Sequence, residues 1–284
     1  MNKKGIFLAI VAAALYAINS PLSKLLLQYV PEKLMAGLLY LGAGLCMGGI
    51  GLSRKLTHNE KKEESLTKRE LPFVIGMVVL DILAPIFLLM GLSRTSAANA
   101  SLLNNFEIVA TAFVAYFAFK ENIKKRLWFG ILFVTISCAI LSFEDASSLQ
   151  FSVGSLFVLL AAVCWGFENN CTRKISSKDP MQIVLLKGIF SGLGSLIIGL
   201  CLGERIKLVW PVFAVLAVGC IAFGLSIYYY VYAQRLLGAA KTSAYYAVAP
   251  FIGAILSLII FGEIPGPHFW AALILMAIGA WLSA

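Results

Sequence analysis

Apolar stretches long enough to cross a lipid bilayer follow one another along the whole sequence. The hydrocarbon core of a bilayer is about 30 Å thick, and a helix of about 20 apolar residues spans it. Of the 284 residues, 60% are hydrophobic and 13% are charged, about half the charge usual in a soluble domain. The stretches lack the alternation of a membrane β-barrel, so their backbone groups must be satisfied within helices. We therefore predict an all-α integral membrane protein with ten transmembrane helices, here called segments one to ten, at residues 5–27, 33–53, 70–92, 97–119, 124–142, 154–174, 181–201, 210–232, 241–261 and 268–284.

The basic residues indicate how the chain is oriented. If the N-terminus is cytoplasmic, the external loops hold five of the 23 Lys and Arg, Lys187 lies inside a segment, and the remaining 17 face the cytoplasm. Cytoplasmic loops characteristically carry this excess. We expect a multi-pass protein of the plasma membrane, the inner membrane in a bacterium, with both termini cytoplasmic and the lipid bilayer as its surroundings. The formal charge of +9 does not indicate a nucleic-acid partner, because the basic residues lie in short loops. The five external residues are Lys24, Lys33, Arg94, Arg205 and Lys207.

The sequence offers no sign of a cofactor, a metal site or an enzyme. It has no phosphate-binding loop, no His-Glu-x-x-His and no glycine-rich dinucleotide motif, and its two histidines, His58 and His268, lie near segment ends. The six cysteines lie within or at the ends of apolar segments, where we expect them to act as small hydrophobic residues and not to form a disulfide framework or a zinc site. They are Cys46, Cys138, Cys164, Cys171, Cys201 and Cys220.

The two halves of the chain repeat each other. We divide them into residues 1–148 with segments one to five and residues 149–284 with segments six to ten. Because each half crosses the membrane five times, the second half enters from the opposite side, and such inverted repeats are typical of secondary transporters. The matching pairs are Gly5 with Gly154, Tyr16 with Trp165, Asn19 with Glu168, Ser20 with Asn169, Ser23 with Thr172, Lys24 with Arg173, Ser101 with Ser243, Glu121 with Glu263 and Trp128 with Trp270.

Several short motifs resemble the EamA-type branch of the drug/metabolite transporter superfamily. They are Gly154 with Trp165-Gly166, Ala-Tyr-Tyr-Ala-Val-Ala-Pro at 244–250, Gly262-Glu263, and Leu-Asn-Asn-Phe-Glu at 103–107. The resemblance covers nearly the whole chain. It implies a central cavity lined mainly by segments one, three, four, six, eight and nine, with five and ten at the periphery. Ile108 stands where the family often has proline, as the second half has at Pro250, so we expect segment four to be straighter than the family pattern implies.

Four charged residues lie within the apolar segments: Asp81, Glu107, Glu168 and Lys187. A charge near the bilayer centre costs at least about 2.5 kcal/mol unless it has a partner, a cavity or a proton. Asp81 and Glu107 are at similar depths in adjacent segments and could share a cavity, where they would carry a proton or recognise a cation, or they could be structural polar groups. Glu168 and Lys187 could form a structural ion pair, contact the substrate, or open and close as a gate.

Polar and aromatic residues surround these charges. Glu107 and Glu168 each share one helix face with two further residues, at the spacing i, i+3 and i+7. The residues on these faces are Asn104, Glu107 and Thr111 in segment four and Trp165, Glu168 and Thr172 in segment six. We predict a substrate-binding or coupling site made of Glu107, Asp81, Glu168, Asn19, Asn104, Trp165, Tyr245, Tyr246 and Lys187, with Tyr16 as a further aromatic wall.

These features favour a secondary active transporter that works by alternating access. Its partner would be a small polar or amphipathic metabolite, amino acid-like or an organic cation, and movement would be driven by exchange or with the proton as coupling ion. Direction of transport, and a monomer against a homodimer, stay open. Two other functions remain possible: an intramembrane lipid-modifying enzyme with Asp81 and Glu107 as acid and base, and a passive channel for small solutes. The mixed-charge stretch 54–70 is expected to be a solvated loop.

Overall fold

The computed structural model describes residues 2–56, 63–118, 120, 124–143 and 152–283. This part of the chain is helical and contains no β-strand. Glu121, which belongs to one of the repeat pairs, lies outside the described residues. The helices are α1 (Lys3–Tyr16), α2 (Asn19–Leu26), α3 (Glu32–Leu56), the 3-10 turn η1 (Lys68–Glu70), α4 (Leu71–Leu92), α5 (Ala97–Leu103), α6 (Phe106–Phe117), α7 (Lys125–Leu141), α8 (Val153–Ile175), α9 (Pro180–Leu186), the π-helix η2 (Lys187–Ser191), α10 (Gly192–Cys201), α11 (Trp210–Val218), the π-helix η3 (Gly219–Leu225), α12 (Ser226–Leu237), α13 (Ala239–Tyr246), α14 (Val248–Phe261) and α15 (Pro267–Ser283).

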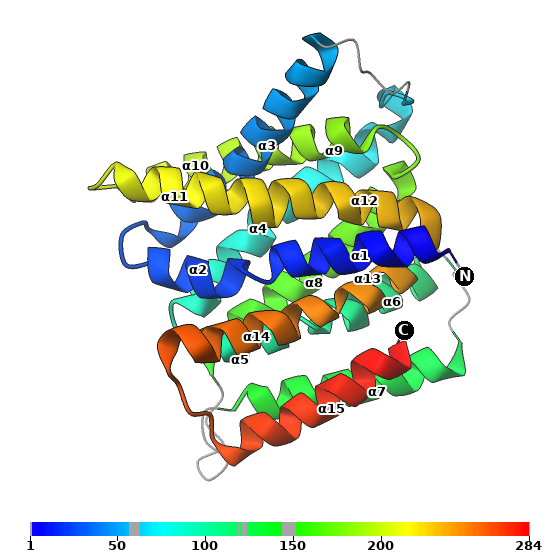
Figure 1. Cartoon of the computed structure of the whole chain (residues 1–284), viewed down its shortest axis with the longest axis vertical. Helices are drawn as coiled ribbons and strands as arrows, with labels where there is room; N and C mark the ends of the chain where they lie inside the picture. The colour runs from blue at the N-terminus through cyan, green and yellow to red at the C-terminus, as the bar shows by residue number, and fades with distance from the viewer. Residues whose placement is uncertain (1, 57–62, 119, 121–123, 144–151, 284) are drawn as a thin grey trace.

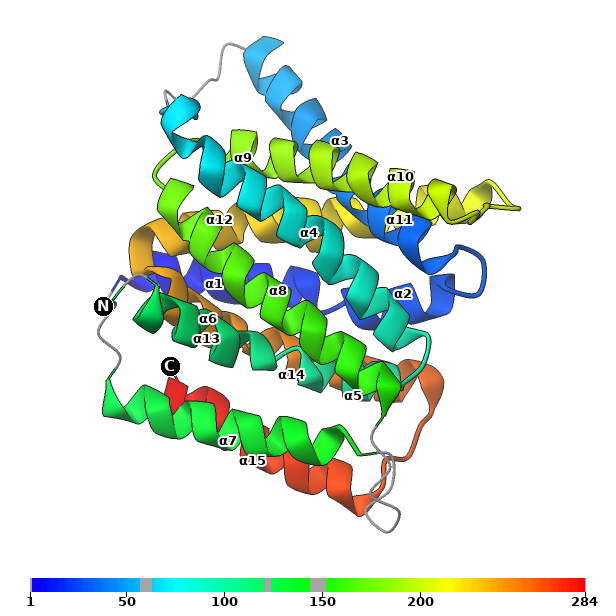
Figure 2. The ribbon, with the colours of Figure 1, turned by 180° about the vertical axis from the view of Figure 1, so that it is seen from behind.

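Every predicted apolar segment is helical in the structure. Within the described residues, eight helical runs are long and apolar enough to cross a membrane, so the chain is a multi-pass membrane protein. The other two segments are α7 and α15, of 17 residues each. They pack mainly against each other along one edge of the bundle and also contact α5, α6 and α13 (Figures 1 and 2).

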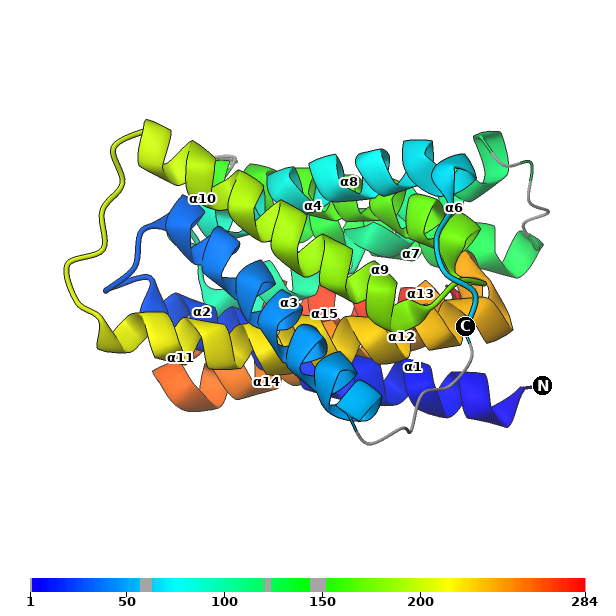
Figure 3. The ribbon, with the colours of Figure 1, turned by 90° about the horizontal axis from the view of Figure 1, so that it is seen from above.

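The helices run roughly along one common direction, and the chain termini lie at the same end of the bundle (Figure 1). Helix α4 packs along α8, and α1 packs along α12. The view from above shows α3 crossing obliquely over the neighbouring helices (Figure 3), and α3 contacts α10, η2 and η3. This arrangement surrounds the middle of α8 with helices from both halves of the chain.

Three of the segments are interrupted near their middles, where a tight turn replaces one helical turn. Segment one breaks between α1 and α2, and segment nine breaks at Ala247 between α13 and α14. Pro21 and Pro250 follow these breaks by a few residues, and a proline cannot donate the backbone hydrogen bond that the carbonyl four residues earlier would accept.

Segment four is interrupted as well, at Asn104 and Asn105. The backbone there closes shorter hydrogen bonds, such as that from Glu107 N to Asn104 O at 3.0 Å. The expectation of a straighter segment four was therefore wrong. Asparagine is a weak helix former, and the segment breaks at these two residues with no proline at position 108.

Glycines let α3 approach the two π-helices closely. A Cβ added to Gly188 would lie 2.2 Å from Gly44 N, and one added to Gly219 would lie 2.1 Å from Leu39 O. Small residues at a helix interface permit this kind of contact in membranes. The glycines of segments two and seven thus act in helix packing.

The same close approach corrects the prediction about the cysteines. Cys46 of α3 and Cys220 of η3 form a disulfide, with their Cα atoms 5.4 Å apart. They are 174 residues apart in the sequence, so no local spacing could have revealed the pair. The other four are free: Cys138, Cys164, Cys171 and Cys201.

The stretch 63–66 contacts the bundle through part of its side chains, while Glu64 and Ser65 remain exposed as expected for a solvated loop. Glu63 forms an ion pair with Arg235 at 3.0 Å and accepts a hydrogen bond from Tyr232 at 2.9 Å. Glu64 accepts a hydrogen bond from Lys178 at 2.9 Å, which raises the pKa of the Lys178 ammonium above its usual value. These contacts tie the link between α3 and α4 to the α8–α9 turn and to α12.

Candidate functional site

A small cavity lies in the middle of the bundle, between helices from both halves of the chain. Its volume of about 50 Å³ holds a few water molecules, whereas a drug-sized ligand needs roughly 300–1,000 Å³. No described residue of α7 or α15 lines it. The lining residues are Tyr16, Tyr40, Asp81, Glu107, Trp165, Glu168, Asn169, Lys187, Phe223, Ile227, Tyr230 and Tyr246.

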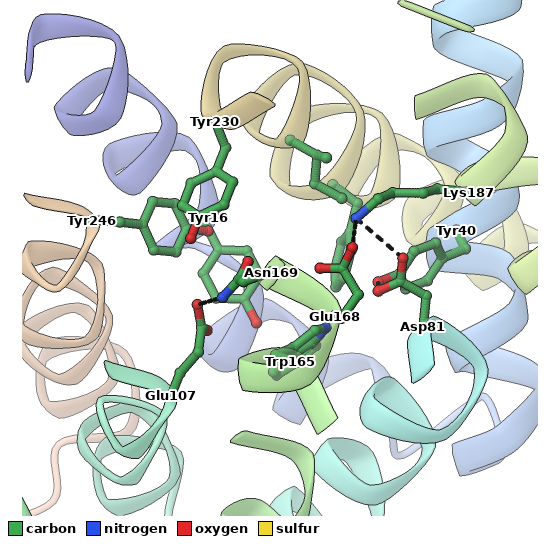
Figure 4. Close-up of a pocket in the computed structure, with 12 residues that line it drawn as sticks. Tyr16, Tyr40, Asp81, Glu107, Trp165, Glu168, Asn169, Lys187, Tyr230 and Tyr246 are labelled. Atoms are coloured by element: carbon green, nitrogen blue, oxygen red, sulfur yellow. Dashed lines mark hydrogen bonds and ion pairs between the residues drawn. The ribbon is translucent and has the colours of Figure 1, made fainter. Parts of the chain in front are cut away.

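Lys187 joins two carboxylates on one side of the cavity (Figure 4). Its Nζ lies 3.2 Å from Asp81 Oδ2 and also contacts Glu168 Oε1. The three side chains are only 4%, 1% and 5% exposed, so their charges compensate each other away from water. Tyr40 donates to Asp81 Oδ1 at 2.7 Å, and Thr172 donates to Glu168 Oε1. Lys187 begins η2, and such local widening of a helix is frequent at functional sites.

Glu107 lies on the opposite side of the cavity, with a different set of partners (Figure 4). Its Oε1 accepts a hydrogen bond from Asn169 Nδ2 at 2.6 Å. Asn169 also donates to Thr111 Oγ1 at 3.2 Å, and Gln234 donates to its backbone carbonyl at 3.2 Å. Within the described part of the chain, Glu107 forms no ion pair. This carboxylate is thus fixed by a neutral amide and remains open to the cavity.

Aromatic rings form the walls next to Glu107. The ring of Tyr16 lies 5.7 Å from that of Tyr246 and 6.2 Å from that of Trp165, measured between centroids. Tyr230 lies 4.8 Å from Tyr246 and shares a hydrogen bond of 2.8 Å with Ser243. The site therefore combines charged groups with ring faces, which can hold both the polar and the apolar part of a small molecule.

A second, smaller cavity adjoins the first, at the interruptions of segments four and nine. It has a volume of about 10 Å³ and shares Tyr16, Glu107 and Tyr246 with the main cavity. Asn104 and Asn105 also line it. Both side chains are buried, and Asn104 Oδ1 and Asn105 Nδ2 have no hydrogen-bond partner in the structure.

Comparison with known proteins identifies the family. The chain matches the EamA-like transporter family over residues 3–143 and 152–284. It belongs to this family. An uncharacterised transporter of Methanothermobacter thermautotrophicus is 27% identical over 270 residues, which cover 89% of this chain and 78% of the relative. The uncharacterised transporter YyaM of Bacillus subtilis is 23% identical over 211 residues, or 69% and 67% of the two chains.

The EamA fold is also present among solved structures. A crystal structure of a protein that is 17% identical superposes with a TM-score of 0.75, covering 99% of this chain and 95% of its own. At that identity the likeness concerns the fold alone. The EamA relatives carry the names of transporters, in line with the expectation that this chain is not an enzyme.

The structure brings most of the predicted site residues of this EamA protein to the cavity. Asn104 lines the adjoining small cavity, whereas Tyr245 lines neither. Asn19 also lines neither cavity; it is fully buried, and its Oδ1 accepts a hydrogen bond from Ser23 at 3.0 Å. The predicted residues that line the main cavity are Asp81, Glu107, Trp165, Glu168, Tyr246 and Lys187.

The charged residues come together in part as expected. Glu168 and Lys187 contact each other, and Asp81 and Glu107 line one cavity. Asp81 in addition contacts Lys187, which the sequence did not predict. The sequence reading also did not place five lining residues in the site: Tyr40, Asn169, Phe223, Ile227 and Tyr230. Asn169 follows Glu168 directly, and that polar neighbour was the available signal.

Proposed function

We propose that this EamA protein is a secondary active transporter, which moves a small polar or amphipathic metabolite across the plasma membrane by alternating access. The observation that carries the proposal is the central cavity with the Glu107 carboxylate, which accepts a hydrogen bond from Asn169 and has no cationic partner among the described residues. A carboxylate is costly in the interior of a membrane protein. A proton or a substrate cation that neutralises the carboxylate stabilises it. Binding of either one can therefore drive a conformational change of the protein.

We further propose ten transmembrane helices, arranged as two inverted five-helix halves at residues 1–148 and 149–284, with both termini cytoplasmic. The pattern of helix packing supports this arrangement. Exchanging the halves turns the contact of α4 with α8 into that of α12 with α1, and the contacts of α5 and α6 with α8 into those of α13 and α14 with α1. The two ranges of the family match also fall one in each half.

Local contacts support the two-fold relation as well. Ser23 donates to Asn19 in segment one, and Thr172 donates to Glu168 in segment six, at matching repeat positions.

Helices α7 and α15 are short for membrane spans. Their 17 helical residues extend about 25 Å, so they would need flanking residues or a locally thinner bilayer to cross.

The interrupted helices could bend during the conformational change. Segments one, four and nine break next to Tyr16, Glu107 and Tyr246, which line the cavity. Each half of such a helix can tilt on its own, because the break already lacks regular helical hydrogen bonds. The cavity would open toward one side of the membrane when these halves tilt, while Lys187 keeps its two carboxylates together.

Transport into proteoliposomes tests the proposal. Vesicles that contain the purified protein and the pH dye pyranine are exposed to a panel of small amines and amino acids under a pH gradient. We expect at least one compound to produce a saturable luminal pH change or exchange flux that Glu107→Gln abolishes. The exposed external residue Glu263 gives the matched control, and Glu263→Gln should transport normally. Full activity of Glu107→Gln would remove Glu107 from the coupling role.

A further inference from the structure

We propose that the cavity selects small organic cations, and that it discriminates against zwitterions such as amino acids and against anions. This inference rests on the proposed transport function and names the substrate class that the site accepts. It follows from the way the charges, the rings and one unpaired oxygen are arranged around Glu107.

The balance of charges is the first step. Lys187 is the one basic residue among the cavity-lining residues that the structure describes, and both Asp81 and Glu168 contact it. Its charge is thus already compensated. With Glu107 ionised, the lining carries a net charge of −2. A cation reduces this charge, whereas the carboxylate of an amino acid would enter a buried site with no free cationic group to meet it.

The adjoining small cavity supplies the second step. Asn104 Oδ1 is a buried acceptor without a donor, beside Glu107. A primary ammonium group has three N–H donors, so it could bind Glu107 and Asn104 at the same time. Asn105 Nδ2 is a buried donor without an acceptor in the same place, but one neutral amide does not replace the cation that a buried carboxylate needs.

The aromatic walls provide the third step. Tyr16, Tyr246 and Trp165 line the main cavity together with Glu107 (Figure 4). Ring faces attract ammonium groups, and the same rings give an apolar surface for the rest of the molecule. The cavity of about 50 Å³ favours a compact ligand, because the rings must move apart to admit a larger one.

A series of four compounds with one ring and different charges tests the proposal. They are 2-phenylethylammonium, phenylalanine, 3-phenylpropionate and 2-phenylethanol. Binding to the purified protein in detergent is measured by calorimetry at pH 7. We expect 2-phenylethylammonium to bind at least tenfold more tightly than phenylalanine, and 3-phenylpropionate to bind most weakly.

Variants assign the effect to the site. Glu107→Gln should weaken binding of the ammonium compound at least tenfold, and Glu263→Gln should not change it. Asn104→Ala should weaken the primary ammonium several-fold but leave its N,N,N-trimethyl analogue unaffected, since that analogue has no N–H donors. Thermal unfolding of each variant, followed by circular dichroism, shows that it is folded. If Glu107→Gln does not fold, the conservative replacement Glu107→Asp takes its place.

Three results would overturn the proposal: tighter binding of phenylalanine or 3-phenylpropionate, equal binding of all four compounds, or no binding of any. Flux measured separately in proteoliposomes distinguishes failure of the cation-selectivity proposal from failure of the transport proposal. Transport of a zwitterion without binding of ammonium compounds would refute the substrate class alone. Binding of the ammonium compound without flux of any compound would instead refute transport.

Discussion

Replacing Lys187 by methionine should strongly destabilise the protein. The methionine side chain has a similar length but carries no charge. Asp81 and Glu168 would then be two buried carboxylates without the cation that both contact in the structure. Removing one partner of a buried ion pair costs more than the pair itself contributes, because it leaves an uncompensated charge.

The magnitude follows from the geometry. At 3.2 Å and an effective dielectric constant of about 20, the attraction between Lys187 and Asp81 is about 5 kcal/mol. The ammonium and the carboxylates lose hydration on burial, which offsets much of this attraction, and the carboxylates can take up protons when the lysine is gone. We therefore expect the free energy of unfolding to fall by about 3–5 kcal/mol, the range for breaking a buried pair.

Unfolding by sodium dodecyl sulfate in mixed micelles measures this loss. The triple variant Lys187→Met, Asp81→Asn, Glu168→Gln removes all three charges and should recover most of the stability. An exposed ion pair usually contributes up to about 1 kcal/mol. If the free energy of unfolding of Lys187→Met lies within about 1 kcal/mol of that of the unmodified protein, the three charges do not stabilise each other as the structure indicates. A triple variant no more stable than the single one would contradict the same reasoning.

Other positions give further predictions. Gly188→Leu should prevent α3 from packing on η2, since a Cβ there would lie 2.2 Å from Gly44 N; a large loss of folded protein in detergent gel filtration is expected, and a normal elution profile would contradict the predicted contact. Arg235→Gln should release the 63–66 stretch from α12 by removing the ion pair with Glu63; limited proteolysis should then cut that stretch faster, and an unchanged rate would show that the contact does not hold it. Glu64 raises the pKa of Lys178. The stabilisation of the 63–66 stretch by their contact is therefore fully present below the usual lysine pKa, and it is lost as the pH rises through the raised pKa. Cutting at 63–66 should accelerate only in that alkaline range, and acceleration already near neutral pH would contradict it.

Much of the fold could be predicted from the sequence, because length and hydropathy determine a membrane helix directly. Every apolar stretch is helical, and segment boundaries agree within a few residues, as for 70–92 against α4 at Leu71–Leu92. The interruptions were harder to predict. Pro250 pointed to the break in segment nine, but segment four breaks at Asn104 and Asn105 with no proline present, and hydropathy does not report where a helix is interrupted.

The site was predicted less completely. Charged residues within apolar segments stood out, and Glu168 and Lys187 do meet. Asp81 and Glu107 line one cavity as expected, but the contact of Asp81 with Lys187 was not predicted, because sequence gives depth along a helix more readily than the direction in which a side chain points. Tyr230 and Phe223 reach the cavity from a segment rich in aromatic residues, and composition alone could not tell those that face the cavity from those that face lipid.

Accessibility of the cavity from each side of the membrane tests the central claim most directly. Ile227 lines the cavity without carrying charge, so Ile227→Cys in a variant without the native cysteines introduces a single reporter thiol. A membrane-impermeant maleimide is applied to oriented vesicles, from outside or from the lumen. The account predicts labelling from both sides, at rates that a bound organic cation changes in opposite directions. Labelling from one side only, under every condition of pH and ligand, would contradict alternating access.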